Sequence, residues 1–304
     1  MYNLLYSELL GTHNGQKLPL LLCPDGTTLS YEEFIALASK FAHVLTGLGL
    51  SPGDRLLVHA QKSPEGLALY AACIQTGIIY LPLNFAYTVK ELTYFIEDSQ
   101  PALVVCDENN QSSLSAITGN LGIKLETLNL DGSGSLAEKS QGKPSTFPTV
   151  KRDLDDLAVN LYTSGTTGFP KGAMLTQENL LSNARTLKEE WHFDSQDVLL
   201  HALPLFHSHG LFVATNVSLL AGGSMIFLPK FDLDQIIEYL PRATTMMGVP
   251  TFYTRLLNSS RLTKELTKEI RLCISGSAPL LAETHIQFKE RTCLLYTSPS
   301  PRDS

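Results

Sequence analysis

Apolar and polar positions repeat at helical spacing between residues 30 and 48. Ser30 followed by Glu33 has the sequence of a capping box, which predicts that a helix begins there. The turn sequence SPGD at 51–54 comes shortly after Gly49, which predicts where the helix ends. One face of this helix is apolar and is expected to face a core, and it carries Phe34, Leu37, Phe41, Val44, Leu45 and Leu48.

Short apolar runs then alternate with helix-like segments. The runs predict strands at 55–60, 78–83, 102–106, 157–163, 198–203, 224–229, 244–249 and 271–276. Helices are expected at 64–75, 91–98, 232–240 and 250–257, and another should begin near Thr176. Residues 109–156 are rich in Ser, Gly, Asn and Lys with weak periodicity, so we expect loops and a subdomain boundary there. The alternation predicts an α/β fold of two packed βα subdomains.

Composition and charge narrow the classes of function. With 43% apolar residues among 304, the chain can bury a sizeable core. The net charge of -7 is spread thinly, and no basic run could follow a nucleic-acid backbone or hold an anionic membrane. No apolar stretch is long enough to span a bilayer, and residues 1–11 resemble neither a signal nor a transit peptide. We therefore expect a cytoplasmic protein with small-molecule partners, no nucleic acid and no membrane span.

The cysteines and the end of the chain add two further expectations. Five scattered cysteines without CxxC spacing predict neither disulfides nor a zinc site, so most should be small buried residues. The helical pattern stops abruptly at Cys293, and CLLYTSPSPRD matches one reading frame of a common sequencing adapter. We interpret 293–304 as not native, which leaves residues 1–292 for fold reasoning. The alternative is a disordered Pro/Ser tail.

The stretch TSGTTGFPK at 163–171 combines four hydroxyl side chains, two glycines and a lysine. Between an expected strand and an expected helix, such a loop can direct backbone N–H and side-chain O–H groups at a polyanion. It is not a Walker A loop, because Pro170 stands where that motif has Gly and Gly172 where it has Ser or Thr. The stretch therefore predicts another kind of phosphate-binding loop. The alternative is a hydroxyl-rich turn of structural use only.

The string YTSGTTGFPKG matches, without a gap, the signature loop YTSGTTGxPKG of adenylate-forming enzymes. This resemblance implies that the loop holds the β- and γ-phosphates of ATP with Mg²⁺ while an acid attacks the α-phosphorus, and that CoA then accepts the acyl group. Fixed donors stabilise the charge that develops during this transfer. The residues that the resemblance assigns to this role are Thr163, Ser164, Gly165, Thr166, Thr167, Gly168 and Lys171.

The resemblance also implies that 1–292 is part of the large N-terminal domain, without the later YGxTE motif and the C-terminal lid domain. We expect such a fragment to be inactive.

Three further stretches resemble the acid-binding parts of that superfamily. HALPLFHSHGLF (201–212) contains His207, which the resemblance places beside the acid's carboxylate as a third catalytic residue with Thr163 and Lys171. MGVPTFYTRLL (247–257) resembles the helix that lines the acyl pocket. ISGSAPL (274–280) resembles the strand and loop against the adenine and the acyl group, which implicates Ser275, Gly276 and Ser277.

A second carboxylate on the acid would need a cation, because a buried unpaired charge is costly. Arg255 could hold such a carboxylate with two hydrogen bonds, although spacing alone favours an arginine on a solvated helix face. The runs YLPLNFAYTVKELTYFI, LPLFHSHGLFVATNVSL and MGVPTFYTRLL closely resemble bacterial malonyl-CoA synthetases. This resemblance implies that Arg255 binds the distal carboxylate of malonate and that Ser277 lines the acyl site. It also implies that Ser208 tunes the tolerance for substituted malonates.

Several alternatives stay open at this point. The acid could be a medium-chain fatty or aromatic acid, and the chain could be a non-catalytic nucleotide-binding paralogue. Amino-acid activation lacks support, because PTFYTRLL offers no Asp for an amino group. His207 and His209 have the spacing of a metal pair but no accompanying acidic or thiol ligands, so no metal site is predicted. His201 is expected to be a hydrogen-bonded core histidine.

Overall fold

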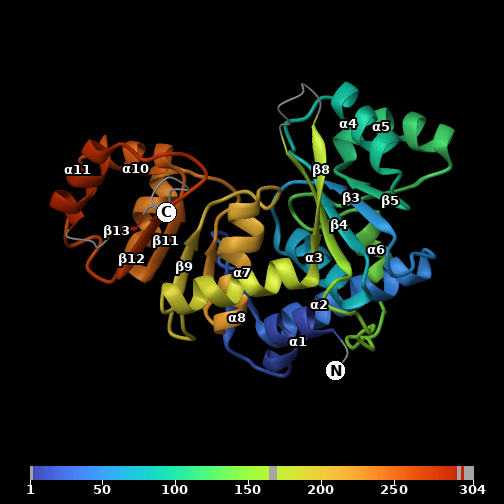
Figure 1. Cartoon of the computed structure of the whole chain (residues 1–304), viewed down its shortest axis with the longest axis horizontal. Coiled ribbons are helices and arrows are strands. Elements are labelled where there is room, and N and C mark those ends of the chain that lie inside the picture. Colours follow the sequence, from blue (N-terminus) through green and yellow to red (C-terminus); the bar gives the residue numbers. More distant parts are fainter. Residues whose placement is uncertain (1–2, 164–169, 293–295, 298–304) are drawn as a thin grey trace. The chain divides into compact units, whose positions relative to one another are not determined.

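The computed structural model describes residues 3–163, 170–292 and 296–297 (Figure 1). The chain divides into two compact units. Unit 1 comprises residues 1–17 and 31–183, and unit 2 comprises residues 18–30 and 184–304, so the division falls within helix α7 (Gln177–Glu190). Both units contain strands and helices in alternation, which confirms the α/β prediction.

Within its described residues, unit 1 contains a six-stranded sheet in the order β6-β5-β3-β4-β7-β8. Its neighbours are parallel except for the antiparallel pair β7 and β8. The strands are β3 (Arg55–His59), β4 (Ile79–Pro82), β5 (Leu103–Cys106), β6 (Lys124–Thr127), β7 (Leu157–Thr163) and β8 (Lys171–Thr176). The helices are α1 (Leu4–Leu9), the 3-10 helix η1 (Gly11–His13), α2 (Tyr31–Gly47), α3 (Pro64–Thr76), α4 (Val89–Ser99), α5 (Glu108–Leu121) and α6 (Ser135–Ser140).

The expected amphipathic helix at 30–48 is α2. Most of its predicted apolar stripe is buried, whereas Leu37 and Leu48 are only half-buried. Helix α3 shows how local signals fix a boundary: the Ser63 hydroxyl accepts a hydrogen bond from the Gly66 amide, Pro64 is the first helical residue, and Gly77 closes the helix in the left-handed region. The expected elements of this unit therefore follow from caps and apolar spacing.

The predicted subdomain boundary at 109–156 is wrong, and the predicted loops make up only part of the stretch. This stretch lies inside unit 1 and contains most of α5 together with β6 and α6. Helix α5 buries only Leu114 and Thr118, so its apolar spacing is weak. Its ends are nevertheless well defined, because Asp107 caps the first turn and Gly122 ends the last one in the left-handed region. Capping residues, rather than an apolar stripe, mark this helix.

Unit 2 contains, among the residues described, a seven-stranded sheet in the order β13-β12-β11-β9-β10-β1-β2. All neighbours are parallel except β1 and β2. The strands are β1 (Pro19–Leu22), β2 (Thr28–Ser30), β9 (Val198–His201), β10 (Ser224–Phe227), β11 (Thr245–Gly248), β12 (Leu272–Ser275) and β13 (Tyr296–Thr297). The helices are α8 (Asn216–Ala221), α9 (Leu233–Tyr239), α10 (Pro250–Leu257) and α11 (Ala282–Thr292), with the π-helix η2 (His209–Thr215) and the 3-10 helix η3 (Leu240–Arg242).

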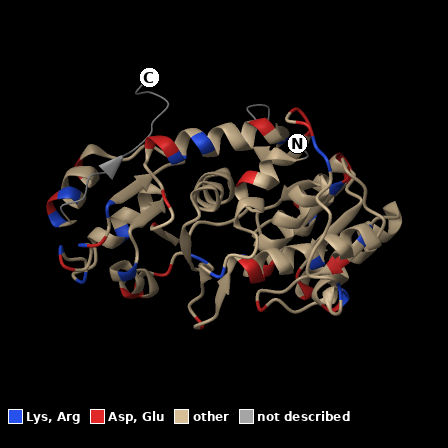
Figure 2. Ribbon diagram, turned by 90° about the horizontal axis from the view of Figure 1, so that it is seen from below, with Lys and Arg blue, Asp and Glu red and all other residues tan. Residues whose placement is uncertain are grey.

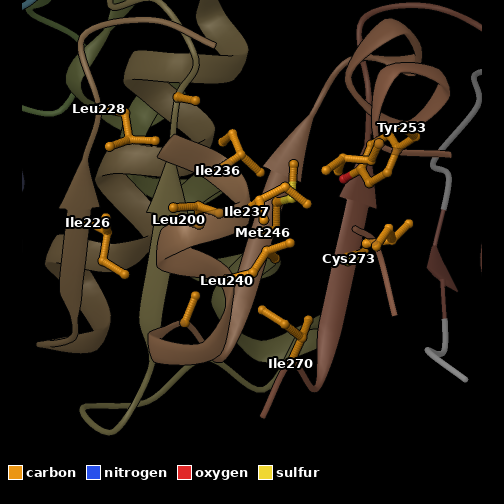
Figure 3. Close-up of a cluster of buried hydrophobic side chains, with 14 of the residues drawn as sticks. Leu200, Ile226, Leu228, Ile236, Ile237, Leu240, Met246, Tyr253, Ile270 and Cys273 are labelled. Carbon is orange, nitrogen blue, oxygen red and sulfur yellow. The ribbon is translucent and has the colours of Figure 1, made fainter. Parts of the chain in front are cut away.

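The core of unit 2 forms where helices cover the parallel strands. Figure 3 shows side chains from β9, β10, β11 and β12 meeting those of α9 and α10, including Leu200, Ile226, Met246 and Tyr253. Tyr253 is fully buried, and its hydroxyl donates to the Ile274 carbonyl oxygen at 2.6 Å. This bond attaches α10 to β12, so the helix that carries Arg255 is fixed to the sheet.

Figure 2 shows that acidic and basic residues are interspersed along the ribbon. Three cysteines, Cys73, Cys106 and Cys273, are buried as free thiols, as the sequence predicted. Within the described residues, no helix is both long and apolar enough to cross a membrane.

Candidate active site

One group of candidate residues lies where β7 and β8 meet in unit 1. Thr163, the last residue of β7, is paired with Lys171, the first residue of β8, and both side chains are exposed. The Thr163 Oγ1 atom lies 3.5 Å from the Lys171 carbonyl oxygen. The remaining residues predicted for the phosphate loop, Ser164, Gly165, Thr166, Thr167 and Gly168, lie outside the described residues.

The predicted connection of this loop is partly wrong. It joins two antiparallel strands rather than a strand and a helix, and α7 begins only after β8. The helix start near Thr176 is confirmed: its hydroxyl accepts from the Asn179 amide at 3.2 Å, and Asn179 Oδ1 accepts from the Thr176 amide at 3.0 Å. Apolar spacing could not reveal β8, because Met174 is 66% exposed on this edge strand.

Gly172 of the signature string has a steric role. A Cβ atom added there would lie 2.6 Å from Asn160 Oδ1 on the neighbouring strand β7. No real Cβ approaches an atom so closely, so a side chain at this position would require the Asn160 amide group to move. The glycine therefore leaves room for the Asn160 side chain next to Lys171.

A separate group of candidate residues lies in unit 2, at the carboxyl ends of β9, β11 and β12. These strands are parallel neighbours, so the segments that follow them meet at one edge of the sheet. His207 and Ser208 follow β9 with exposed side chains, whereas Gly276 and Ser277 follow β12. The residues that the sequence assigned to the acid's carboxylate and to the acyl group thus follow strands that end at the same edge of the sheet.

A contact between Ser277 and His209 joins the segments that follow β12 and β9. The Ser277 Oγ atom lies 3.3 Å from His209 Nδ1. Gly276 allows the approach, because a Cβ there would lie 2.9 Å from His209 Cε1. Ser277 itself has a φ of 68°, a conformation that L residues adopt at a cost of about 1–3 kcal/mol. Strain of this size is typical of functional sites.

His209 is a neutral group in this environment. Its side chain is 7% exposed, and burial lowers its pKa to about 4. It can therefore accept a hydrogen bond from the Ser277 hydroxyl at neutral pH. From the sequence, His209 was a candidate only as one of a metal pair. Its place at the start of the segment HGLF, beyond a parallel strand, was the signal that could have marked it as a site residue.

The backbone around His209 forms the π-helix η2, a geometry that is frequent at functional sites. Fully buried His201, at the end of β9, supports it. His201 Nε2 lies 3.0 Å from both the Gly210 carbonyl oxygen and Thr215 Oγ1. The prediction of a hydrogen-bonded core histidine is confirmed.

Arg255 lies on α10, which begins two residues after β11 ends. Its guanidinium carbon is 5.5 Å from the centre of the Phe231 ring, which in turn contacts the Phe252 ring at 4.3 Å. The side chain is exposed, and in the described part of the chain no carboxylate lies within ion-pair distance of it. A cation held by aromatic contact without a carboxylate partner is suited to binding an anion.

Ser275 differs from its neighbours. Its side chain is fully buried in β12, and its hydroxyl has no hydrogen-bond partner among the described residues. A ligand could contact Ser275 through its backbone, or through a ligand group that reaches Oγ. A hydrogen bond from such a group would offset the free-energy cost of the unpaired buried hydroxyl.

Among the described residues there is no group of three His, Cys, Asp or Glu side chains that could hold a metal ion.

Known proteins show what this chain is similar to. The family model for AMP-binding enzymes matches residues 13–298. MatB from Rhodopseudomonas palustris is 49% identical in its apo crystal structure, with a TM-score of 0.96 and coverage of 99% of this chain and 60% of that chain. In its ATP-bound crystal structure the identity is 50% and the TM-score 0.94, with coverage of 98% and 60%.

Two curated relatives act on different acids. A malonate–CoA ligase from Arabidopsis thaliana is 32% identical over 291 residues, which covers 88% of this chain and 46% of the relative. A feruloyl-CoA synthase from an Amycolatopsis species is 30% identical over 268 residues, with coverage of 88% and 52%. The chain therefore spans about half the length of the curated relatives it matches.

Proposed function

The chain belongs to the AMP-binding enzyme family, and on this premise we propose that the complete protein is an ATP-dependent acid:CoA ligase that converts malonate to malonyl-CoA. A carboxylate oxygen of malonate attacks the α-phosphorus of ATP, and pyrophosphate leaves. The thiol sulfur of CoA then attacks the acyl carbonyl of malonyl-adenylate, and AMP leaves. The similarity to MatB and to a malonate–CoA ligase supports this proposal.

In the nucleotide half of the reaction, the ends of β7 and β8 carry the phosphate-binding groups. Thr163 and Lys171, with residues 164–168 between them, donate to the β- and γ-phosphates and stabilise the charge on the leaving oxygens. Mg²⁺ commonly binds phosphate oxygens with only one or two protein carboxylates. It therefore needs no cluster of protein ligands such as a structural metal site requires.

In binding of the acid, the residues at the carboxyl edge of the unit 2 sheet have different roles. His207 and Ser208 lie beside the reacting carboxylate, while the backbone from Ser275 to Ser277 contacts the adenine and the acyl group. Arg255 binds the second carboxylate of malonate. The observation that carries the choice of malonate is the exposed Arg255 guanidinium, which has no carboxylate partner in the described part of the chain.

An aromatic acid is the second candidate. The feruloyl-CoA synthase relative favours it, as does the pair of aromatic rings Phe231 and Phe252 beside Arg255. A phenylpropanoid acid has a single carboxylate, so it would leave the arginine without a function in binding. Replacement of Arg255 therefore distinguishes the two acids.

The test is acid-dependent AMP formation by the complete gene product with Arg255→Leu. We expect kcat/KM for malonate to fall by about 100-fold or more, the scale of a lost charged hydrogen-bonded contact, while acetate use stays within about threefold. Arg242→Leu is the matched control, because Arg242 also lies over an aromatic ring, Tyr239, at 5.4 Å. Equal losses for malonate and acetate would contradict the malonate assignment.

A further inference from the structure

Helix α4 in unit 1 (Figure 1) contacts β7 next to Thr163 and also Pro170, the residue that precedes β8. Its ends are fixed locally. Thr88 and Glu91 form a capping box at the start, and Gln100 closes the helix in the left-handed region. Leu92, Phe95 and Ile96 are buried in the apolar core that also includes strands β3, β4 and β5. The helix is therefore a fixed element of unit 1.

The first contact is with the end of β7. The Tyr162 ring packs against the Phe95 ring, with centroids 4.6 Å apart, and the Tyr162 hydroxyl donates to Asp98 Oδ2. Tyr162 directly precedes Thr163. Because successive side chains of a strand point to opposite faces, Thr163 is directed away from the face that Tyr162 packs on α4.

The second contact is with the residue that precedes β8. The Tyr94 hydroxyl donates to the Pro170 carbonyl oxygen at 3.0 Å, and Pro170 directly precedes Lys171. Tyr94 and Asp98 are four residues apart, so they are neighbours on the same side of α4. One face of α4 therefore contacts the residue immediately before Thr163 and the residue immediately before Lys171.

We propose that Tyr94 and Asp98 are positioning residues for nucleotide binding: they hold the two strand ends that carry Thr163 and Lys171 in the arrangement that receives the phosphates. This inference rests on the proposed role of those two residues. Loss of either contact lets a strand end move, and the groups that bind phosphate must then be ordered when nucleotide binds. The cost appears in nucleotide affinity rather than in the overall stability of the fold.

The test compares MgATP binding by the complete gene product, measured by calorimetry, with its amide hydrogen exchange at 160–163 and 171–175. Tyr94→Phe removes a single hydrogen bond and is expected to raise Kd two- to tenfold, which corresponds to about 0.5–1.4 kcal/mol. Asp98→Ala and Tyr162→Phe should each raise Kd. Both variants remove the same hydrogen bond, between Tyr162 and Asp98, so the double variant should raise Kd no further than either single variant. Exchange at the strand ends should become faster.

Two controls exclude a general effect on the helix. Glu97→Ala removes an exposed carboxylate from the same turn of α4, and Tyr87→Phe removes a hydroxyl from a ring that packs on Phe95 at 4.9 Å. Both should leave Kd and exchange unchanged. Faster exchange with an unchanged Kd, or an unchanged exchange rate in Tyr94→Phe and Asp98→Ala, would overturn the positioning role alone. A wild-type complete gene product that fails to bind MgATP would overturn that role together with the proposed function.

Discussion

The Ser277 hydroxyl lies 3.3 Å from Nδ1 of His209, and this contact joins the segment after β12 to the first residue of the π-helix η2. Neither residue could form it if position 276 carried a side chain. The hydroxyl, the imidazole and the glycine between them therefore act as one unit at the carboxyl edge of the sheet. Changes to any of the three should affect acid binding before they affect folding.

Gly276→Ala should displace the His209 ring, because the added Cβ would lie 2.9 Å from its Cε1 atom. We expect kcat/KM for the acid to fall by about tenfold or more in the complete gene product, since misplacement of binding groups is costly to catalysis. Gly119→Ala is the control: Gly119 is in α5 with no neighbouring atom within 4 Å of an added Cβ. It should raise the melting temperature slightly and leave kcat/KM unchanged. Unchanged kinetics in Gly276→Ala would exclude the proposed unit.

The stability of the chain should fall between pH 6.5 and pH 4. Burial lowers the pKa of His209 to about 4, so in this range the unfolded state takes up a proton that the folded state does not. Stability therefore decreases as pH falls, by about 3 kcal/mol at most from this residue. Urea unfolding at pH 7 and pH 4.5 measures the effect. His209→Gln should reduce the pH dependence, and an identical dependence in that variant would contradict the neutral buried state.

Asp197→Ala should lower the free energy of unfolding by about 3 kcal/mol. Arg271 holds this nearly buried carboxylate with two hydrogen bonds, from Nε to Oδ1 at 2.8 Å and from Nη2 to Oδ2 at 2.6 Å. Burial alone would raise the pKa of Asp197, but the hydrogen bonds from Arg271 and Thr244 lower it overall. Its contribution should thus be present at neutral pH and be lost as pH falls below about 4. Urea unfolding checks both statements.

The matched control for this ion pair is Asp234→Ala. Asp234 also binds an arginine, Arg261, but both side chains are largely exposed, so the pair should contribute little. A similar loss of stability in both variants would show that burial of Asp197 is not the source of the effect.

Lys171→Met should weaken nucleotide use if Lys171 binds phosphate. We expect kcat/KM for ATP to fall by about 100-fold, the scale of one lost donor to developing charge, with a smaller effect on KM for the acid. Lys151→Met, at an exposed position of the same unit, is the control. Equal effects on the two substrates would argue against a phosphate contact.

Most of the core and the family could be predicted from sequence, because apolar runs such as 102–106 and caps such as Ser63 carry strong local signals. Helix α5 was missed, since its exposed surface is so polar that only Asp107 and Gly122 mark it. Strand β8 was missed because its pairing with β7 is a long-range property, and its exposed Met174 obscures the alternation.

The candidate site was predictable only in part. The signature string marked Thr163 and Lys171 as candidates, and the resemblance marked Arg255 and Ser277; their roles stay predictions. The contact between His209 and Ser277 depends on two parallel strands that are far apart in sequence, so no local pattern indicates it. The role of α4 was hidden for the same reason, because Tyr94 and Pro170 are 76 residues apart.

The most direct measurement is AMP formation by the complete gene product with ATP, Mg²⁺ and CoA, comparing malonate, methylmalonate, acetate and octanoate at equal concentration. We predict a strong preference for malonate, with methylmalonate second. Activity with octanoate or acetate alone would retain the adenylation chemistry and contradict the malonate assignment. No acid-dependent AMP formation with any of them, nor with ferulate, would contradict the ligase function itself.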